Sequence, residues 1–186
     1  MNADCILEGE KVRLRPVREE DLPHFQRWLN DPDVLQWLTL PKGPTIEEER
    51  EWWEAEQRNP DDIVWAIEAL DGLLLGDLAL RPNPLGRWAD LGIFIGEKAQ
   101  WGRGYGTDAV RTLLCYAFAG MRLNRVSLTT DELNARALRC YEKCGFVREG
   151  LLRQQRLVDG QFRNSVLMGV LREEFVRQPG GGLGAD

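Results

Sequence analysis

The chain has 186 residues, of which 43% are hydrophobic and 29% charged, an ordinary composition for a globular protein. Its net charge is −6, and it has no basic stretch that could follow a phosphate backbone, which argues against nucleic acid as a partner. No apolar run approaches the roughly 18 residues of a membrane span, and residues 1–9 lack the layout of a secretion signal. We therefore expect a cytoplasmic protein without membrane partners.

The residue types that hold metals or form disulfides are few. There are four cysteines and one histidine, His24. Such a set predicts neither a disulfide framework nor a metal site. Cys140 and Cys144 are four residues apart, so they can share one face of a helix, and we interpret them as small apolar helix residues.

The first half of the chain predicts an early strand, several helices and a hairpin. Thr45 and Glu48 form a capping-box pattern that begins a helix, and Asp71-Gly72 is typical of a hairpin turn. Asp31-Pro32 is expected to stop the helix before it. From alternation and helical periodicity, we expect a strand over 10–17, a helix over 19–29, a helical turn over 34–38, a helix over 45–59 and strands over 63–70 and 73–80.

In the second half, strands and helices alternate around a glycine-rich segment. The expected elements are a strand over 88–96, a turn over 100–107, a core-facing helix over 110–118, a strand over 126–130, a helix over 134–144 and strands over 146–153 and 164–171. The strand-helix-strand passages predict a parallel step. We expect an α/β fold in one domain, 1–177, with a mixed sheet flanked by helices, and a disordered tail over 178–186.

The glycine-rich segment joins a predicted strand to a predicted helix. Gly102, Gly104 and Gly106 let the backbone turn tightly and approach a ligand closely. Convergent N–H groups and the positive end of the helix dipole can then bind phosphate, with Arg103 adding charge at the rim. A plain tight turn is the simpler interpretation. The spacing differs from the dinucleotide-binding G-x-G-x-x-G, and the Gly-Lys pair of a P-loop is missing.

Two motifs in this half resemble the GNAT family of N-acetyltransferases, and the resemblance extends over residues 11–175. The first is Trp-Gly-Arg-Gly-Tyr-Gly over 101–106, where Trp101 replaces the family's usual Gln or Arg. That departure is familiar in the branch that resembles ribosomal-protein N-terminal acetyltransferases. The second, over 134–146, looks like the family's Asn-x-x-Ala-x-x-x-Tyr-x-x-x-Gly-Phe segment. The stretches 149–150 and 159–164 are similar to those of spermidine acetyltransferases. They also resemble those of N-terminal acetyltransferases and of members of unknown substrate, so they support the branch without choosing the acceptor.

The resemblance implies a GNAT-like acyl-CoA N-acyltransferase fold whose central sheet splays open, with acetyl-CoA as the co-substrate. Its pantetheine arm would lie in the gap along Phe94, Ile95 and Gly96. Its pyrophosphate would lie on the turn formed by Gly102, Arg103, Gly104, Tyr105, Gly106 and Thr107. Asn134 would be a polar contact to the cofactor.

Acetylation of an amine needs an acceptor for the amine proton and a donor for the leaving thiolate. Tyr141 is the expected acid, because a phenol can protonate a thiolate; a buried core tyrosine is the alternative. Asp90 is the expected base, although a solvated strand carboxylate fits it equally well. Glu68 and Asp77 are weaker candidates, and bulk water could also remove the proton.

The acceptor is left open by the sequence. The helix from Thr45 is rich in glutamate and carries Trp52 and Trp53, which could bind a cationic amine; an acidic solvated face with core tryptophans is the simpler interpretation. The candidates are an N-terminal peptide amine, a polyamine and an aminoglycoside-type amine. A catalytically silent CoA-binding module and a nucleotide-binding regulatory domain are the alternative functions. A homodimer is compatible with the acetyltransferase and with both alternatives.

Overall fold

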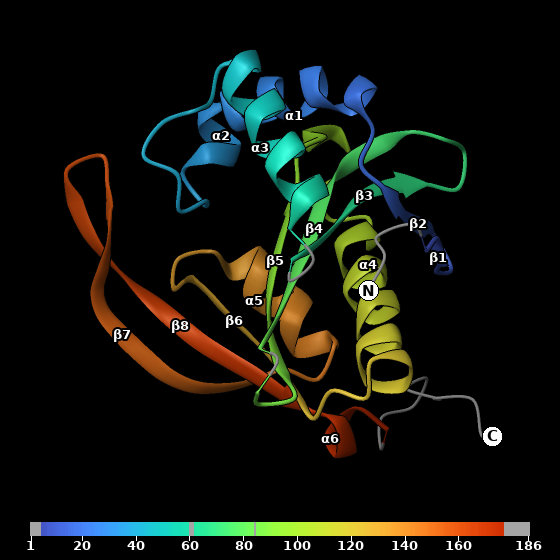
Figure 1. Ribbon diagram of the computed structural model, residues 1–186. Helices are drawn as coiled ribbons and strands as arrows, with labels where there is room; N and C mark the ends of the chain where they lie inside the picture. Colours follow the sequence, from blue (N-terminus) through green and yellow to red (C-terminus); the bar gives the residue numbers. More distant parts are fainter. Residues whose placement is uncertain (1–4, 60–61, 84, 177–186) are drawn as a thin grey trace.

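The computed structural model describes residues 5–59, 62–83 and 85–176, so the predicted tail over 178–186 lies outside the described residues. Its strands form one sheet in the order β1-β2-β3-β4-β5-β6-β8-β7 (Figure 1). They are β1 (Leu7–Glu8), β2 (Val12–Pro16), β3 (Ile63–Ala69), β4 (Leu74–Asn83), β5 (Trp88–Ile95), β6 (Arg125–Asp131), β7 (Val147–Val158) and β8 (Gln161–Leu171). The β5–β6 pair is parallel and the other pairs are antiparallel.

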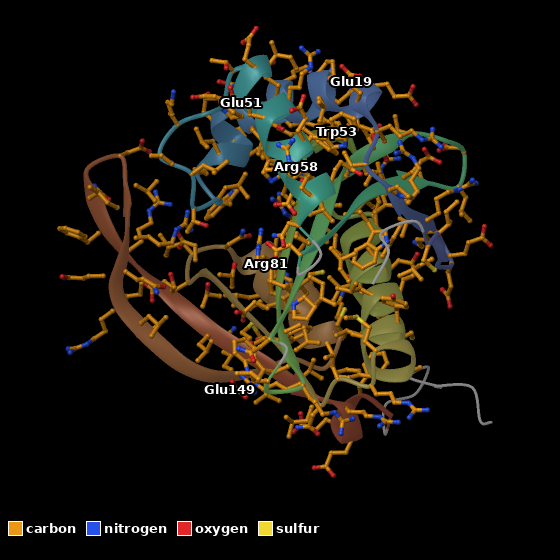
Figure 2. The ribbon with its side chains drawn as sticks, viewed as in Figure 1. Glu19, Glu51, Trp53, Arg58, Arg81 and Glu149 are labelled. Atoms are coloured by element: carbon orange, nitrogen blue, oxygen red, sulfur yellow. The ribbon has the colours of Figure 1, made fainter. Side chains whose placement is uncertain are left out.

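The helices lie on both faces of this sheet, as the sequence predicted. They are α1 (Leu22–Leu29), α2 (Pro32–Leu35), α3 (Ile46–Arg58), α4 (Tyr105–Cys115), α5 (Ala135–Lys143) and α6 (Arg172–Val176). Figure 2 shows Glu19 and Glu51 at the helical end of the molecule and Glu149 at the opposite end. No helix of the described part of the chain is both long and apolar enough to cross a membrane.

Alternation along the central strands assigns each face of the sheet to its helices, because successive side chains point to opposite faces. On β3, Trp65 packs in the larger core with α4 and α5, whereas its neighbour Val64 packs with α1. Phe25 and Trp28 of α1 meet the ring of Phe94 edge to face, at centroid distances of 6.1 and 6.5 Å. The helices are therefore fixed against the strands that line the site.

Several element bounds differ from the predictions. Asp31 does not simply end a helix: its carboxylate caps α2 by accepting the Asp33 N–H at 2.9 Å, and Pro32 is the first helical residue. Strand β4 extends to Asn83, beyond the expected end at residue 80. Strands β7 and β8 both extend to the Asp159-Gly160 turn. β7 is an edge strand whose side chains are exposed from Val147 to Gln155. Its run 153–156 is polar throughout and shows no hydrophobic alternation from which a strand could be predicted.

The sheet separates between its two parallel strands. β5 and β6 pair only at Trp88 with Arg125, Ala89 with Val126 and Asp90 with Ser127. Beyond this point β5 stays paired with β4, and β6 stays paired with β8. Residues 91–95 and 128–131 therefore border a gap within the sheet, as expected for a splayed central sheet.

Candidate active site

The glycine-rich turn connects β5 to α4 at the open end of this gap. Gly102 and Gly104 have φ angles of 77° and 90°, in the left-handed region that favours glycine. Gly106 differs, because it lies inside α4, where a Cβ would have ordinary contacts of 3.6 Å to Ile95 and 3.8 Å to Cys140. Two of the three glycines are thus required by the turn's backbone.

The side chains of Trp101 and Arg136 border the turn, and their interaction was not predicted from the sequence. The Trp101 indole N–H donates to the Ile95 carbonyl at 2.7 Å. The Arg136 guanidinium, from α5, stacks 3.6 Å above the Trp101 ring centroid, a favourable cation–π geometry. Arg136 forms no ion pair within the described part of the chain. A cation without an anionic partner therefore lies beside the turn.

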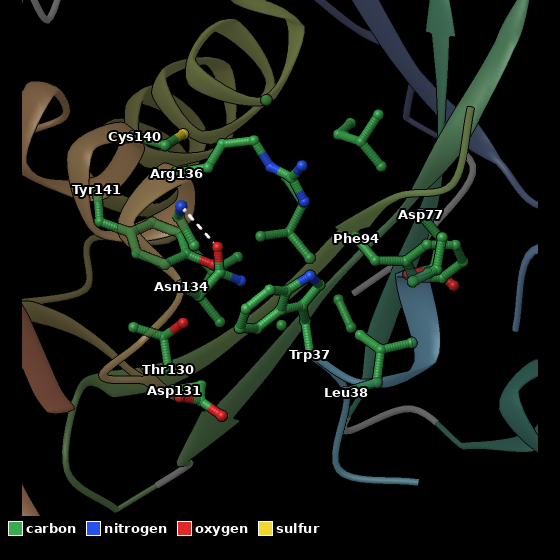
Figure 3. Close-up of a pocket in the computed structure, with 18 of the residues that line it drawn as sticks. Trp37, Leu38, Asp77, Phe94, Thr130, Asp131, Asn134, Arg136, Cys140 and Tyr141 are labelled. Atoms are coloured by element: carbon green, nitrogen blue, oxygen red, sulfur yellow. Dashed lines mark hydrogen bonds between the residues drawn. The ribbon is translucent and has the colours of Figure 1, made fainter. Parts of the chain in front are cut away.

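A cavity of about 830 Å³ fills the gap between β5 and β6 and continues under the segment after α2. Figure 3 shows Tyr141, Asn134 and Arg136 on one side of it and Phe94 and Asp77 on the other. Of the predicted cofactor residues, eight line the cavity: Phe94, Ile95, Gly102, Gly104, Tyr105, Gly106, Thr107 and Asn134. The structure therefore brings most of that set together.

Gly96 and Arg103 do not line the cavity. Gly96 is buried against the Trp28 ring, which a Cβ would overlap, and its N–H donates to the Leu75 carbonyl at 2.8 Å. Arg103 is exposed, and its carbonyl accepts from the Lys11 ammonium at 3.1 Å.

Asn134 has a structural role besides its position in the cavity wall. It is the N-cap of α5, and its side-chain oxygen accepts the Ala137 N–H at 3.1 Å (Figure 3). Its amide NH₂ group donates no hydrogen bond to a described residue. Asn134 can therefore cap the helix and still donate into the cavity.

Tyr141 lies on α5 and lines the cavity while being only 8% exposed. Its ring packs against Phe146 at a centroid distance of 5.8 Å. Burial raises the pKa of Tyr141 well above its usual range, and the neighbouring Cys140 and Cys144 thiols add to the rise. The phenol therefore stays protonated at neutral pH and can act as a proton donor.

Asp90 is not brought together with Tyr141. Its side chain is exposed, accepts the Ser127 hydroxyl at 2.8 Å and lies outside the residues that line the cavity. The reason is its position at the end where β5 and β6 still pair. Glu68 is also engaged elsewhere, in ion pairs with Arg15 at 2.7 Å and Arg13 at 3.5 Å.

Three carboxylates line the cavity: Asp131 of β6, which pairs with Arg156, and two others, Asp77 of β4 and Glu49 of α3. Asp77 is the cross-strand partner of Phe94 (Figure 3). Burial, and then the nearby Glu49 carboxylate, raise the pKa of Asp77 to about 7. Burial also raises the pKa of Glu49 to about 7, with a contribution from Glu48. Neither Asp77 nor Glu49 forms an ion pair with any described residue. Sequence analysis named Asp77 only as a weaker candidate for the base.

Residues 11–147 match the Acetyltransferase (GNAT) domain family. This chain belongs to the GNAT family. It is 27% identical to the spermidine N(1)-acetyltransferase of Escherichia coli K12 over 91% of both chains. It is 29% identical to an aminoglycoside N(6')-acetyltransferase type 1 of Klebsiella pneumoniae, over 76% of this chain and 77% of that one. The Vibrio cholerae spermidine N-acetyltransferase structure, with CoA and spermine, has a TM-score of 0.83 and 22% identity over 89% of this chain and 98% of that one.

Family membership confirms the resemblance and the fold expected from the two motifs. The chain is a GNAT N-acetyltransferase and thus an acyltransferase. GNAT enzymes use acetyl-CoA, and the Vibrio cholerae structure contains CoA. The relatives are named for different amines, a polyamine and an aminoglycoside. Distant relatives therefore leave the acceptor of this GNAT enzyme to be inferred from its own cavity.

Proposed function

We propose that this GNAT enzyme transfers the acetyl group of acetyl-CoA directly to a primary amine of a cationic small molecule. The observation that carries the proposal is the pair of carboxylates, half-buried Asp77 and buried Glu49, which line the same cavity as the glycine turn and Tyr141. Without ion-pair partners of their own, they favour a ligand that brings positive charge. A polyamine fits this requirement, and so does an aminoglycoside.

Acetyl-CoA would supply the activated acetyl group, and the turn has features that suit its phosphates. Gly102 and Gly104 leave the backbone N–H groups free of side chains, and the N-terminus of α4 contributes its positive dipole end. Arg136, held on the Trp101 ring, adds a full positive charge. Residues 91–95 pair with β4 on one edge but not with β6 on the other, so the edge facing the gap offers backbone hydrogen-bonding groups.

In the proposed chemistry, two residues of the chain move the two protons. The neutral amine attacks the thioester carbonyl, a C–N bond forms and the C–S bond breaks. Asp77, whose pKa of about 7 matches the working pH of a base, accepts the amine proton directly or through water. The Tyr141 hydroxyl donates its proton to the departing thiolate. No covalent acyl-enzyme is required, so Cys140 and Cys144 have no part in the transfer.

The direct test is release of CoA from acetyl-CoA, followed with a thiol reagent. Spermidine, a peptide with a free N-terminus and kanamycin serve as acceptors, with Tyr141→Phe as the matched variant. We expect release that depends on a polycationic amine and falls steeply in the variant. Release with the peptide alone would refute the cationic small-molecule acceptor.

A thermal-unfolding comparison addresses the two non-enzymatic alternatives. Acetyl-CoA should raise the melting temperature, because a ligand that binds only the folded state stabilises it, whereas NAD and ATP should not. Stabilisation by acetyl-CoA without release for any amine would favour a silent CoA-binding module. Stabilisation by NAD or ATP alone would favour a nucleotide-binding regulatory domain.

A further inference from the structure

Arg156, on the edge strand β7, is buried although it carries a charge. It is only 8% exposed, and its Nη1 pairs with the Asp131 carboxylate at 3.0 Å. Asp131 ends β6, is completely buried and lines the cavity. A second arginine, Arg163 of β8, lies 3.6 Å from the same carboxylate oxygen. Asp131 therefore has two arginines near its carboxylate, so the need to neutralise its charge does not by itself explain why Arg156 is buried.

The other end of the Arg156 guanidinium bonds to a segment far away in the sequence. Nη2 donates to the Gln36 carbonyl at 3.1 Å and to the Leu38 carbonyl at 2.7 Å. Both carbonyls follow the end of α2, where backbone acceptors have lost their helical partners and a cation is favourable. One guanidinium thus joins β6, β7 and the segment after α2.

That segment forms one wall of the cavity. Trp37, Leu38, Thr39 and Leu40 line it together with Glu49, and Figure 3 shows Trp37 and Leu38 facing the interior. α2 spans only Pro32–Leu35, too few residues to hold the segment by helix formation alone. Its amide hydrogen bonds are local, from Trp37 to Val34 at 3.1 Å and from Leu38 to Leu35 at 2.9 Å.

We infer that Arg156 is a positioning residue that holds the wall 36–40 over the acceptor end of the cavity. The inference rests on the proposed function in one respect, that the amine enters at this end. A planar guanidinium with several N–H donors can serve one carboxylate and two carbonyls at once, whereas the compact ammonium of lysine cannot reproduce this fork. The bonds to the two carbonyls distinguish Arg156 from Arg163.

The test compares Arg156→Gln and Arg156→Lys with Arg163→Gln as the matched control. Hydrogen–deuterium exchange of the Trp37 and Leu38 amides is measured first, because it needs no acceptor. We expect both Arg156 variants to exchange about tenfold faster, the size expected for losing charge-assisted hydrogen bonds. Arg163→Gln keeps the wild-type rate. Unchanged exchange in Arg156→Gln, equal acceleration in Arg163→Gln, or wild-type exchange in Arg156→Lys would each overturn the inference.

Steady-state kinetics with spermidine then connects the wall to the reaction. In the Arg156 variants we expect the KM for spermidine to rise about tenfold, with the KM for acetyl-CoA unchanged. Equal increases in both constants would indicate general damage and contradict the positioning role. If no amine is acetylated even by the wild type, the proposed function fails and the exchange rates alone decide on Arg156.

Discussion

At the residue scale, the site depends on side chains whose protonation is set by burial. Tyr141 stays protonated because the cavity wall removes it from water, and Asp77 takes up its proton near neutrality because of desolvation and then because Glu49 lies close by. An acid that holds its proton and a base that releases it near neutral pH are the combination that amine acetylation needs. Both assignments remain proposals until the variants are measured.

Tyr141→Phe should lower kcat by about 10² to 10³, the usual contribution of a general acid. The KM for acetyl-CoA should change little, because the phenyl ring and its packing on Phe146 remain. Tyr116→Phe is the matched control, since Tyr116 packs on Trp65 and does not line the cavity. Equal rates for Tyr141→Phe and the wild type would exclude the phenol as the acid.

Asp77 should give the reaction a pH dependence. A base must be ionised, so kcat/KM is expected to rise as pH increases through about 7, the pKa of Asp77. Asp77→Asn should lower kcat/KM and remove this rise. Asp90→Asn should keep the wild-type profile, because Asp90 is outside the cavity. If Asp90→Asn removed the rise and Asp77→Asn kept it, Asp90 would be the base instead of Asp77.

At the element scale, the sequence predicted the order of strands and helices well, and it placed a glycine-rich turn between β5 and α4. Alternation and helical spacing report on elements that pack against one core, and these elements were located correctly. The edge strand β7 was placed too short because its polar run is exposed on both sides over 153–155 and buries only the charged Arg156. The partners of Arg136 and Arg156 were not predictable, because each contact joins segments that only the folded chain brings together.

The two glycines of the turn should respond differently from Gly106. Gly104→Ala forces an alanine to a φ of 90° and should destabilise the fold by roughly 1 kcal/mol or more, while weakening acetyl-CoA binding. Gly106→Ala has ordinary contacts for its new methyl group and should unfold at nearly the wild-type urea concentration. Equal midpoints for the two variants would show that the left-handed backbone is not needed.

At the scale of the whole molecule, the buried carboxylates make stability depend on pH. Glu49 and Asp77 have folded pKa values of about 7, above their ordinary values of 4.5 and 3.8. At pH values between the ordinary and the folded pKa of each group, the folded chain binds more protons than the unfolded chain. The free energy of unfolding should therefore fall as pH rises towards 7. The site is therefore assembled at a cost to stability that is greatest at neutral and alkaline pH.

Urea unfolding between pH 5 and pH 8 measures this effect. The wild type should lose stability across that range, and Glu49→Gln should lose less, because glutamine has no charge to bury. Glu51→Gln is the matched control on the exposed side of α3. Parallel curves for the wild type and Glu49→Gln would show that the Glu49 carboxylate is not the source of the pH dependence.

The separation of β5 from β6 also places two strand edges in the interior of the protein. Strand edges usually lie at the periphery, where they are blunted because they recruit other chains. Here residues of α5 and of the glycine turn line the same cavity as these edges. The fold can thus keep unpaired backbone donors and acceptors for a small ligand without the aggregation hazard that such edges create elsewhere.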